Sequence, residues 1–407
     1  RDQGLTTHAR GGFRPAGERL ITLDALRGFA ILGILVPNMF AFAWPMAATV
    51  EPGLMGDLPW NGFAHTLNST AFLGKFMFNF AMLFGAGVVL FDRKTTPADR
   101  APRLGDGWAL WYRRCGVLLV IGLLHAYFFW FGDILFTYAV AGLTAVWWIR
   151  KLNAPVLIGG GLGLFALGTC LTAGFMLLGV WAVGAGKATE GDLVGQPELE
   201  IAGYLGTWLD AFAVRFGTVI FLQFFMLLFM PAIVGIMALG MGLTKAGVLT
   251  GERSTRFHAA LCVSMLALGV LATASVWMFV NGLDLPVPVG FVWQAIAQFV
   301  GLPLAIGYSQ IVVLACRSAS LRVPIRGLAN VGRMALSNYL SHTLICTSMF
   351  YGYGLGYFAS IPFPHLFGLI LAIWVFNFAF SALWLRYFRF GPAEWVWRQM
   401  TYLGIRN

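Results

Sequence analysis

Residues 23–38 read LDALRGFAILGILVPN, an apolar run that begins with two charged side chains. Asp24 and Arg27 stand three residues apart, so a helix places them on one face, where they can pair. Asn38 follows Arg27 by about three helical turns and therefore points the same way. Because ionisable groups within a membrane need a partner, a watery cavity or a function, two interpretations of Arg27 stay open. It contacts a ligand, or it only reaches the cytoplasmic interface with Asp24 as its counter-charge.

The rest of the chain is equally apolar. Of its 407 residues, 59% are hydrophobic and 11% are charged, whereas about 25% of a soluble protein is charged. Ten apolar runs follow one another, at about 20 residues for each membrane crossing. They cover residues 23–45, 67–91, 108–131, 133–149, 156–184, 212–244, 258–281, 290–316, 332–357 and 365–388. The sequence therefore predicts an all-α integral membrane protein, a single polytopic bundle of about ten transmembrane helices.

Lysine and arginine alternate between the loops. Of the 27 basic residues, 23 lie in or beside alternate loops, beginning with the N-terminal segment. The loops on the other side contribute only Lys187 and Arg215, in residues 185–215, and Arg27 and Lys75 lie inside spans. Basic loops stay in the cytoplasm, so both termini are predicted to be cytoplasmic. The net charge of +10 follows this pattern, and we expect no nucleic-acid partner. Three segments result: a basic cytoplasmic tail (1–21), one transmembrane helical domain (22–390) and a C-terminal cytoplasmic tail (391–407).

Several common kinds of site have no sequence motif here. The five cysteines stand singly, without a CxxC or CxxxC pair, so the sequence predicts neither a metal site nor a disulfide framework. There is no Walker A loop, no GxGxxG after a strand, no HExxH and no GxSxG. No apolar run contains paired carboxylates, which makes an ion-coupled transporter less expected.

The third run ends in GLLHAYFFWFGD, and this corner carries the strongest candidate chemistry. His125 lies about 9 Å along the helix axis from the end of the run. Asp133 follows in a tight turn, where its carboxylate could orient His125 or an incoming acceptor. A lone histidine in an apolar helix is often a satisfied core residue, but within a membrane a functional role is the stronger expectation.

The second run, FLGKFMFNFAMLFGAG, contains Lys75 and, four residues on, Asn79 on the same helical face. Lys75 is either an anchor that extends to the interface or a ligand contact. The small residues at 85–87 predict close packing against another helix.

The ninth run begins GRMALSNYLSHTLICTS and carries a broad polar stripe. Arg333, Ser337 and Ser341 repeat every four residues, and Asn338 and His342 lie beside them. Such a stripe lines a cavity or makes hydrogen bonds between helices, and its histidine can act as a base or a ligand. For His65, His258 and His365, at the ends of runs, an interfacial position is expected.

Three stretches together resemble a known family: LDALRGFAILGILVPN, GLLHAYFFWFGDILFTYAVAGL and GRMALSNYLSHTLICTSMFYGYGLG, with the closing RYFRFGPAEWVWRQMTY. The chain resembles the YeiB-like family of bacterial inner-membrane proteins, a domain of unknown function, over nearly its whole length, and residues 230–400 carry the most specific part. That family resembles the transmembrane acyltransferases, including acyltransferase-three proteins and heparan-glucosaminide N-acetyltransferase. The resemblance implies a multi-pass inner-membrane enzyme that transfers an acyl group from cytoplasmic acyl-CoA to an outer acceptor.

This chain differs from the acyltransferase-three proteins at one important position in the first span. Acyltransferase-three proteins carry an Arg, ten residues and then a catalytic His in their first span, whereas here Arg27 is followed by Asn38, which cannot accept a proton at neutral pH. The base is therefore expected elsewhere, at His125 with Asp133 or at His342. The motif around Tyr339 and His342 is similar to the GxxSYxLYLxH of that family.

We therefore predict an acyltransferase that uses acyl-CoA as co-substrate and no metal. Arg27 and Arg333 would bind the CoA phosphates, because guanidinium is a planar, permanently charged fork. Asn38, Lys75 and Asn338 would line a polar cavity and stabilise the oxyanion, and His125, Asp133 and His342 would supply the base. Expected partners are membrane lipids and an envelope acceptor (sugar, lipid or amine), and a homodimer stays open. The alternative is a transporter or a lipid- or small-molecule-binding protein that uses the same cavity without chemistry.

Overall fold

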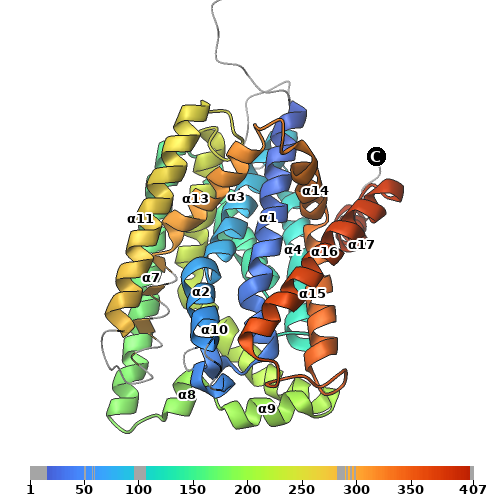
Figure 1. Cartoon of the computed structure of the whole chain (residues 1–407). Coiled ribbons are helices and arrows are strands. Elements are labelled where there is room, and N and C mark those ends of the chain that lie inside the picture. The colour runs from blue at the N-terminus through green and yellow to red at the C-terminus, as the bar shows by residue number, and fades with distance from the viewer. Residues whose placement is uncertain are drawn as a thin grey trace, which may run out of the picture.

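A computed structural model describes residues 16–49, 52–56, 58, 60–95, 107–281, 289, 292, 293, 296, 297 and 299–403. These residues form a bundle of helices, with no strand among them (Figure 1). The first half contains α1 (Ala16–Ala43), α2 (Asn61–Leu67), η3 (Asn68–Phe72), α3 (Lys75–Thr95), α4 (Trp108–Phe128), α5 (Leu135–Ala141), η4 (Gly142–Val146), α6 (Trp147–Ile149) and α7 (Ala154–Gly184). The second half contains α8 (Glu190–Val194), α9 (Pro197–Leu205), α10 (Trp208–Lys245), α11 (Thr255–Asn281), α13 (Leu302–Ala315), α14 (Arg322–Arg333), α15 (Ala335–Phe350), α16 (Phe363–Tyr387) and α17 (Pro392–Tyr402). Two short turns, η1 (Met46–Thr49) and η2 (Pro52–Met55), follow α1.

Seven helical stretches are long and apolar enough to cross a membrane: Ile21–Ala43, Asn61–Thr95, Trp108–Phe128, Ala154–Gly184, Trp208–Lys245, Thr255–Phe279 and Phe363–Tyr387. The prediction of an all-helical chain with several candidate membrane spans is confirmed for the described residues. The three other predicted runs also contain helices, which are shorter. Leu135–Ile149 and Leu302–Ala315 are apolar, and α15 has 16 residues. Among the described residues, length and composition therefore give seven candidate crossings.

Glycines let the helices cross at backbone contact. A Cβ on Gly28 of α1 would stand 1.9 Å from the Leu328 carbonyl oxygen of α14, and one on Gly332 would stand 1.8 Å from the Asp24 carbonyl oxygen. The predicted notch in the second run behaves in the same way, since a Cβ on Gly85 would stand 2.0 Å from the Met237 carbonyl oxygen of α10. Only glycine fits such crossings.

Hydrogen bonds also connect α1 to the C-terminal part of the chain. The Trp374 indole N–H of α16 donates to the Leu32 carbonyl at 2.9 Å. The Trp44 indole N–H, just after α1, donates to the Ile361 carbonyl at 2.8 Å. The first helix is consequently packed against the end of the chain, and Figure 1 shows it among α3, α14, α15 and α16.

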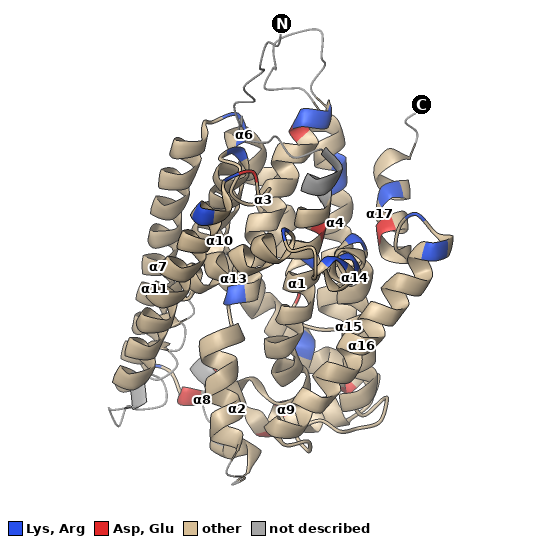
Figure 2. Ribbon diagram, turned by 45° about the horizontal axis from the view of Figure 1, so that its top comes forward, with Lys and Arg blue, Asp and Glu red and all other residues tan. Residues whose placement is uncertain are grey.

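Charge separates the two ends of the bundle. Figure 2 shows Lys and Arg near the start of α1 and around α6, α14 and α17, while the opposite end carries the acidic α8 and α9. The predicted N-terminal tail lies partly outside the described residues, and its residues 16–21 already belong to α1.

The predicted C-terminal tail contains a helix, α17, that is attached to the bundle. Its Trp397 indole N–H donates to the Arg114 carbonyl at 2.9 Å, and the Arg114 guanidinium lies 3.8 Å from the Trp397 ring centre. The Glu394 carboxylate accepts the Leu336 N–H at 2.7 Å and so satisfies the start of α15. Burial raises the pKa of Glu394 above its usual value. These contacts fix α17 at the basic end.

Candidate active site

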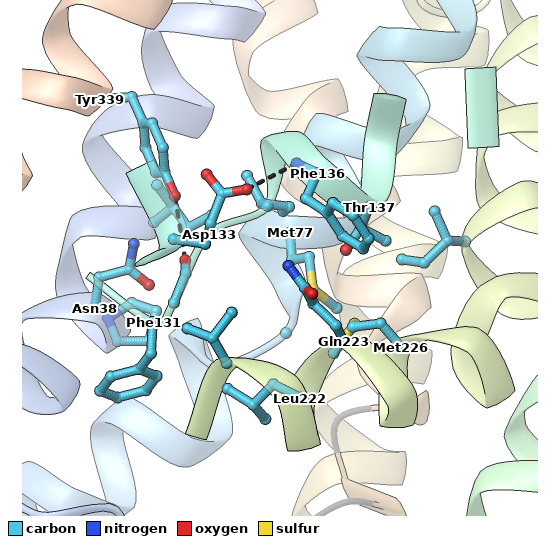
Figure 3. Close-up of a pocket in the computed structure, with 18 of the residues that line it drawn as sticks. Asn38, Met77, Phe131, Asp133, Phe136, Thr137, Leu222, Gln223, Met226 and Tyr339 are labelled. Carbon is cyan, nitrogen blue, oxygen red and sulfur yellow. Dashed lines mark hydrogen bonds between the residues drawn. The ribbon is translucent and has the colours of Figure 1, made fainter. Parts of the chain in front are cut away.

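A cavity of about 190 Å³ lies between α1, α3, α4, α5 and α10. Its wall is mostly apolar, with five polar side chains: Asn38, Asp133, Thr137, Gln223 and Tyr339. Figure 3 shows these side chains around the space, with Asp133 between Tyr339 and Phe136. An apolar pocket with a few placed polar groups is the usual form of a small-molecule site.

The corner after α4 brings His125 and Asp133 together, as the sequence predicts. The His125 Nδ1 lies 2.8 Å from Asp133 Oδ2, and His125 Nε2 lies 2.8 Å from Thr343 Oγ1 of α15. An ionised Asp133 accepts from Nδ1–H, which leaves Nε2 to accept the Thr343 hydroxyl. The three side chains form a hydroxyl–imidazole–carboxylate relay of two hydrogen bonds.

Access to this relay is from the carboxylate end. The side chains of His125 and Asp133 are 3% and 1% exposed, and of the two only Asp133 lines the cavity. Asp133 Oδ1 also accepts the Phe136 N–H at 2.7 Å, at the beginning of α5. The carboxylate therefore has a fixed orientation at the cavity wall.

Arg215 of α10 holds the same corner in place. Its side chain is fully buried, and its Nε and Nη1 donate to the Tyr127 and Phe129 carbonyls at 2.9 and 2.7 Å. These carbonyls end α4 without partners within the helix, so the guanidinium satisfies them.

A second cavity of about 180 Å³ adjoins the first. Both are lined by Pro37, Asn38, Leu73, Phe131 and Gly132. The second is also lined by Phe40, Ala41, Thr49, His65, Asn68, Trp130 and Phe363. Asn38 lies at the boundary between the two spaces, where it can contact a ligand in either.

His342 and Asn338 belong to a different cluster. His342 Nε2 lies 2.8 Å from Asn377 Oδ1 of α16, and Asn377 Nδ2 donates to Asn338 Oδ1 at 3.2 Å. Asn338 also donates to Ser381 Oγ at 3.0 Å. Neither His342 nor Asn338 lines the two cavities, because both side chains contact α16.

Lys75 is fully buried and lines neither cavity. Its Nζ donates to the Ser69 carbonyl at 2.9 Å, within the π-helical turn that precedes α3. Its ammonium group is therefore held inside the protein, and its predicted place in a cavity with Asn38 stays a prediction. The chain turns sharply at Leu73–Gly74, so these two residues reach the first cavity while Lys75 faces away from it.

The two predicted CoA-binding arginines lie away from the cavities. Arg27 Nη1 donates to Asp24 Oδ1 at 2.9 Å, the predicted pair, and the Arg27 side chain is 32% exposed. Arg333 is exposed and donates to the Arg389 carbonyl at 3.3 Å. Because α1 and α14 cross at Gly28 and Gly332, both arginines lie beside this crossing.

Sequence reasoning missed several polar groups at the two cavities. Gln223 is an isolated amide within a long apolar run, and its Nε2 has no hydrogen-bond partner among the described residues. Thr343 directly follows the predicted His342, yet it is Thr343 that contacts His125. His65, for which the sequence predicts an interfacial position, lines the second cavity. Because an amide within an apolar run is unusual, the sequence alone could have indicated Gln223 as a candidate site residue.

Comparison with known proteins decides the family. The chain is 32% identical over 403 residues to "Uncharacterized protein YeiB" of Escherichia coli (strain K12), covering 94% of this chain and 96% of that protein. The chain belongs to the YeiB-like family. It is 30% identical to "Uncharacterized protein YxaH" of Bacillus subtilis (strain 168), covering 95% of each chain.

Another YeiB-like relative is the "Uncharacterized 39.9 kDa protein in amylase 3'region" of Bacillus acidopullulyticus, 28% identical over 95% of this chain and 94% of its own length. The family described as "Protein of unknown function (DUF418)" matches residues 243–404, the C-terminal part that the resemblance singled out. No solved structure matches the chain significantly.

Proposed function

We propose that this YeiB-like protein is a multi-pass protein of the bacterial inner membrane, with ten crossings and both termini in the cytoplasm. The segregation of basic and acidic residues to opposite ends of the bundle supports this orientation (Figure 2). The three shorter helical stretches, Leu135–Ile149, α13 and α15, would then supply the remaining crossings, packed against the longer helices.

Within that frame, we propose acyl transfer from acyl-CoA to a hydroxyl or amine acceptor. The observation that carries the proposal is the relay from Thr343 through His125 to Asp133, which ends at the wall of a mostly apolar cavity. A cavity of about 190 Å³ has room for a group the size of benzene, which occupies an engineered cavity of about 150 Å³ in another protein. That room fits a short acyl group beside its thioester.

The reaction follows from where these groups lie. The acceptor oxygen or nitrogen attacks the thioester carbonyl carbon, a C–O or C–N bond forms, and the C–S bond breaks to release the thiolate. Asp133 takes the acceptor proton at the cavity wall, with His125 steadying the carboxylate through Nδ1–H, and the proton then passes to the thiolate. The Asn38 amide donates to the oxyanion. Arg27 and Arg333 attract the CoA phosphates at the basic end.

Acyl transfer in vesicles reconstituted with the purified protein tests this proposal. A positioned base contributes about 10²–10⁴-fold, so Asp133→Asn and His125→Ala should each lower the rate at least tenfold while acyl-CoA binding is unchanged. His365→Ala, at an exposed position outside both cavities, is the matched control. His342→Ala, tested beside them, distinguishes the two candidate bases. An unchanged rate in both the Asp133 and the His125 variants would refute the assignment.

One observation favours a second candidate, a binding or transport protein without chemistry. Both ring nitrogens of His125 already have partners, and the cavity wall is mostly apolar. Native mass spectrometry of the protein from its own membrane distinguishes the two. A retained lipid or small molecule, together with no transfer to any acceptor, would support binding alone.

A further inference from the structure

The second cavity has a composition of its own. Aromatic rings form much of its wall, and its polar side chains are Asn38, Thr49, His65 and Asn68. No Asp, Glu, Lys or Arg lines it among the described residues. A charged ligand would be desolvated there without a counter-charge, which is strongly unfavourable.

Two buried polar groups in this wall have no hydrogen-bond partner within the part of the chain that the structure describes. They are the Trp130 indole N–H and the Asn68 side-chain oxygen, on residues that are 1% and 6% exposed. Buried polar groups of native proteins are nearly always paired, so each unpaired one requires an explanation. Together they offer one donor and one acceptor.

His65 adds a second acceptor. Its Nε2 lies 2.7 Å from the Thr49 carbonyl oxygen, which can only accept, so Nε2 carries the hydrogen. In the neutral ring, Nδ1 then carries no hydrogen, and its lone pair can accept a hydrogen bond. Hydroxyl groups both donate and accept, and they match this mixed set better than an amine or a carboxylate does.

We propose that the second cavity binds a neutral, hydroxyl-bearing molecule the size of one sugar ring. Its volume of about 180 Å³ suits a six-membered ring, and the Trp130 and Phe363 rings supply apolar faces for the C–H face of a sugar. Because Asn38 borders both cavities, a hydroxyl held here faces the acyl site. This ligand is the acceptor only if the proposed acyl transfer is correct, whereas the binding itself does not depend on that reaction.

Saturation-transfer NMR on the protein in lipid nanodiscs, free of sugar detergents, tests the binding. The probes are glucose, glucosamine and glucuronate, which share a ring but differ in charge. Glucose should bind saturably and at least tenfold more tightly than the two charged analogues. Equal binding of all three, or no binding of glucose, would overturn the proposal.

Variants then locate the site. Trp130→Phe keeps an aromatic ring but removes the indole N–H, and it should weaken glucose binding about tenfold. Trp147→Phe is the matched control, because Trp147 is equally buried, its Nε1 also has no partner among the described residues, and it lines neither cavity. Asn68→Leu should weaken binding by a similar factor. Equal effects of the Trp130 and Trp147 changes would contradict the location.

The two proposals can fail separately. Glucose binding that depends on Trp130, without transfer to any acceptor, would refute acyl transfer and leave the sugar site standing. Acyl transfer that proceeds although glucose does not bind, or binds unaffected by Trp130→Phe and Asn68→Leu, would refute the sugar site alone.

Discussion

Arg215 is a fully buried arginine whose contacts are structural rather than catalytic. Replacing it with Met leaves the Tyr127 and Phe129 carbonyls without their donor, at about 1–3 kcal/mol for each buried group. Arg215→Met should therefore lower the apparent melting temperature in nanodiscs. Arg322→Met, at an exposed site, is the control. Equal melting temperatures for the two variants would show that the α4 carbonyls find other partners.

At the same scale, the sequence predicts only part of the candidate site. His125 and Asp133 are eight residues apart across a tight corner, so their pairing follows from local geometry. Thr343 reaches His125 from 218 residues away, and no local pattern contains that contact. The stripe on α15 shows the same limit, since its spacing indicates a polar face but not which helix that face meets. His342 therefore contacts Asn377 of α16 and does not line the predicted cavity.

Among the elements, the crossing of α1 and α14 is the most sensitive to side-chain size. A methyl group on Gly332 would overlap the Asp24 carbonyl, so the two helices would have to separate. Overpacking of this kind costs about 1–3 kcal/mol. Gly332→Ala should lower the apparent melting temperature, whereas Gly116→Ala on α4, with nothing within 4 Å of its added methyl group, should not. A stable Gly332→Ala protein would mean that the crossing is adjustable.

Helix positions were predictable because apolar runs and membrane thickness set them, and each of the ten runs contains a helix. The lengths of the helices were less predictable. The run at 133–149 contains a π-helical turn at Gly142–Val146, and hydropathy alone does not register such an interruption. The charge pair of Asp24 and Arg27 was predictable because it depends only on helical spacing.

The proposed orientation of the whole molecule can be tested by labelling introduced cysteines with a reagent that does not cross the membrane. Ala185→Cys lies between α7 and α8 at the acidic end, and Ser320→Cys lies before α14 at the basic end; both positions are exposed. In a Cys170→Ser background, a membrane-impermeant maleimide should label the first in intact spheroplasts. It should label the second only after the membrane is opened. Labelling of both in intact spheroplasts would refute the orientation.

The contact between α1 and the last third of the chain also bears on biosynthesis. Ribosomes deliver α1 first, but its partners at Gly332, Ile361 and Trp374 emerge last. Until then the glycine face of α1 lacks the helix, α14, that packs against it. Premature stop codons before α14 should thus yield nascent chains that remain substrates for membrane proteases. A C-terminal fragment such as 243–404 would equally lack α1, so heterologous expression calls for the full-length gene.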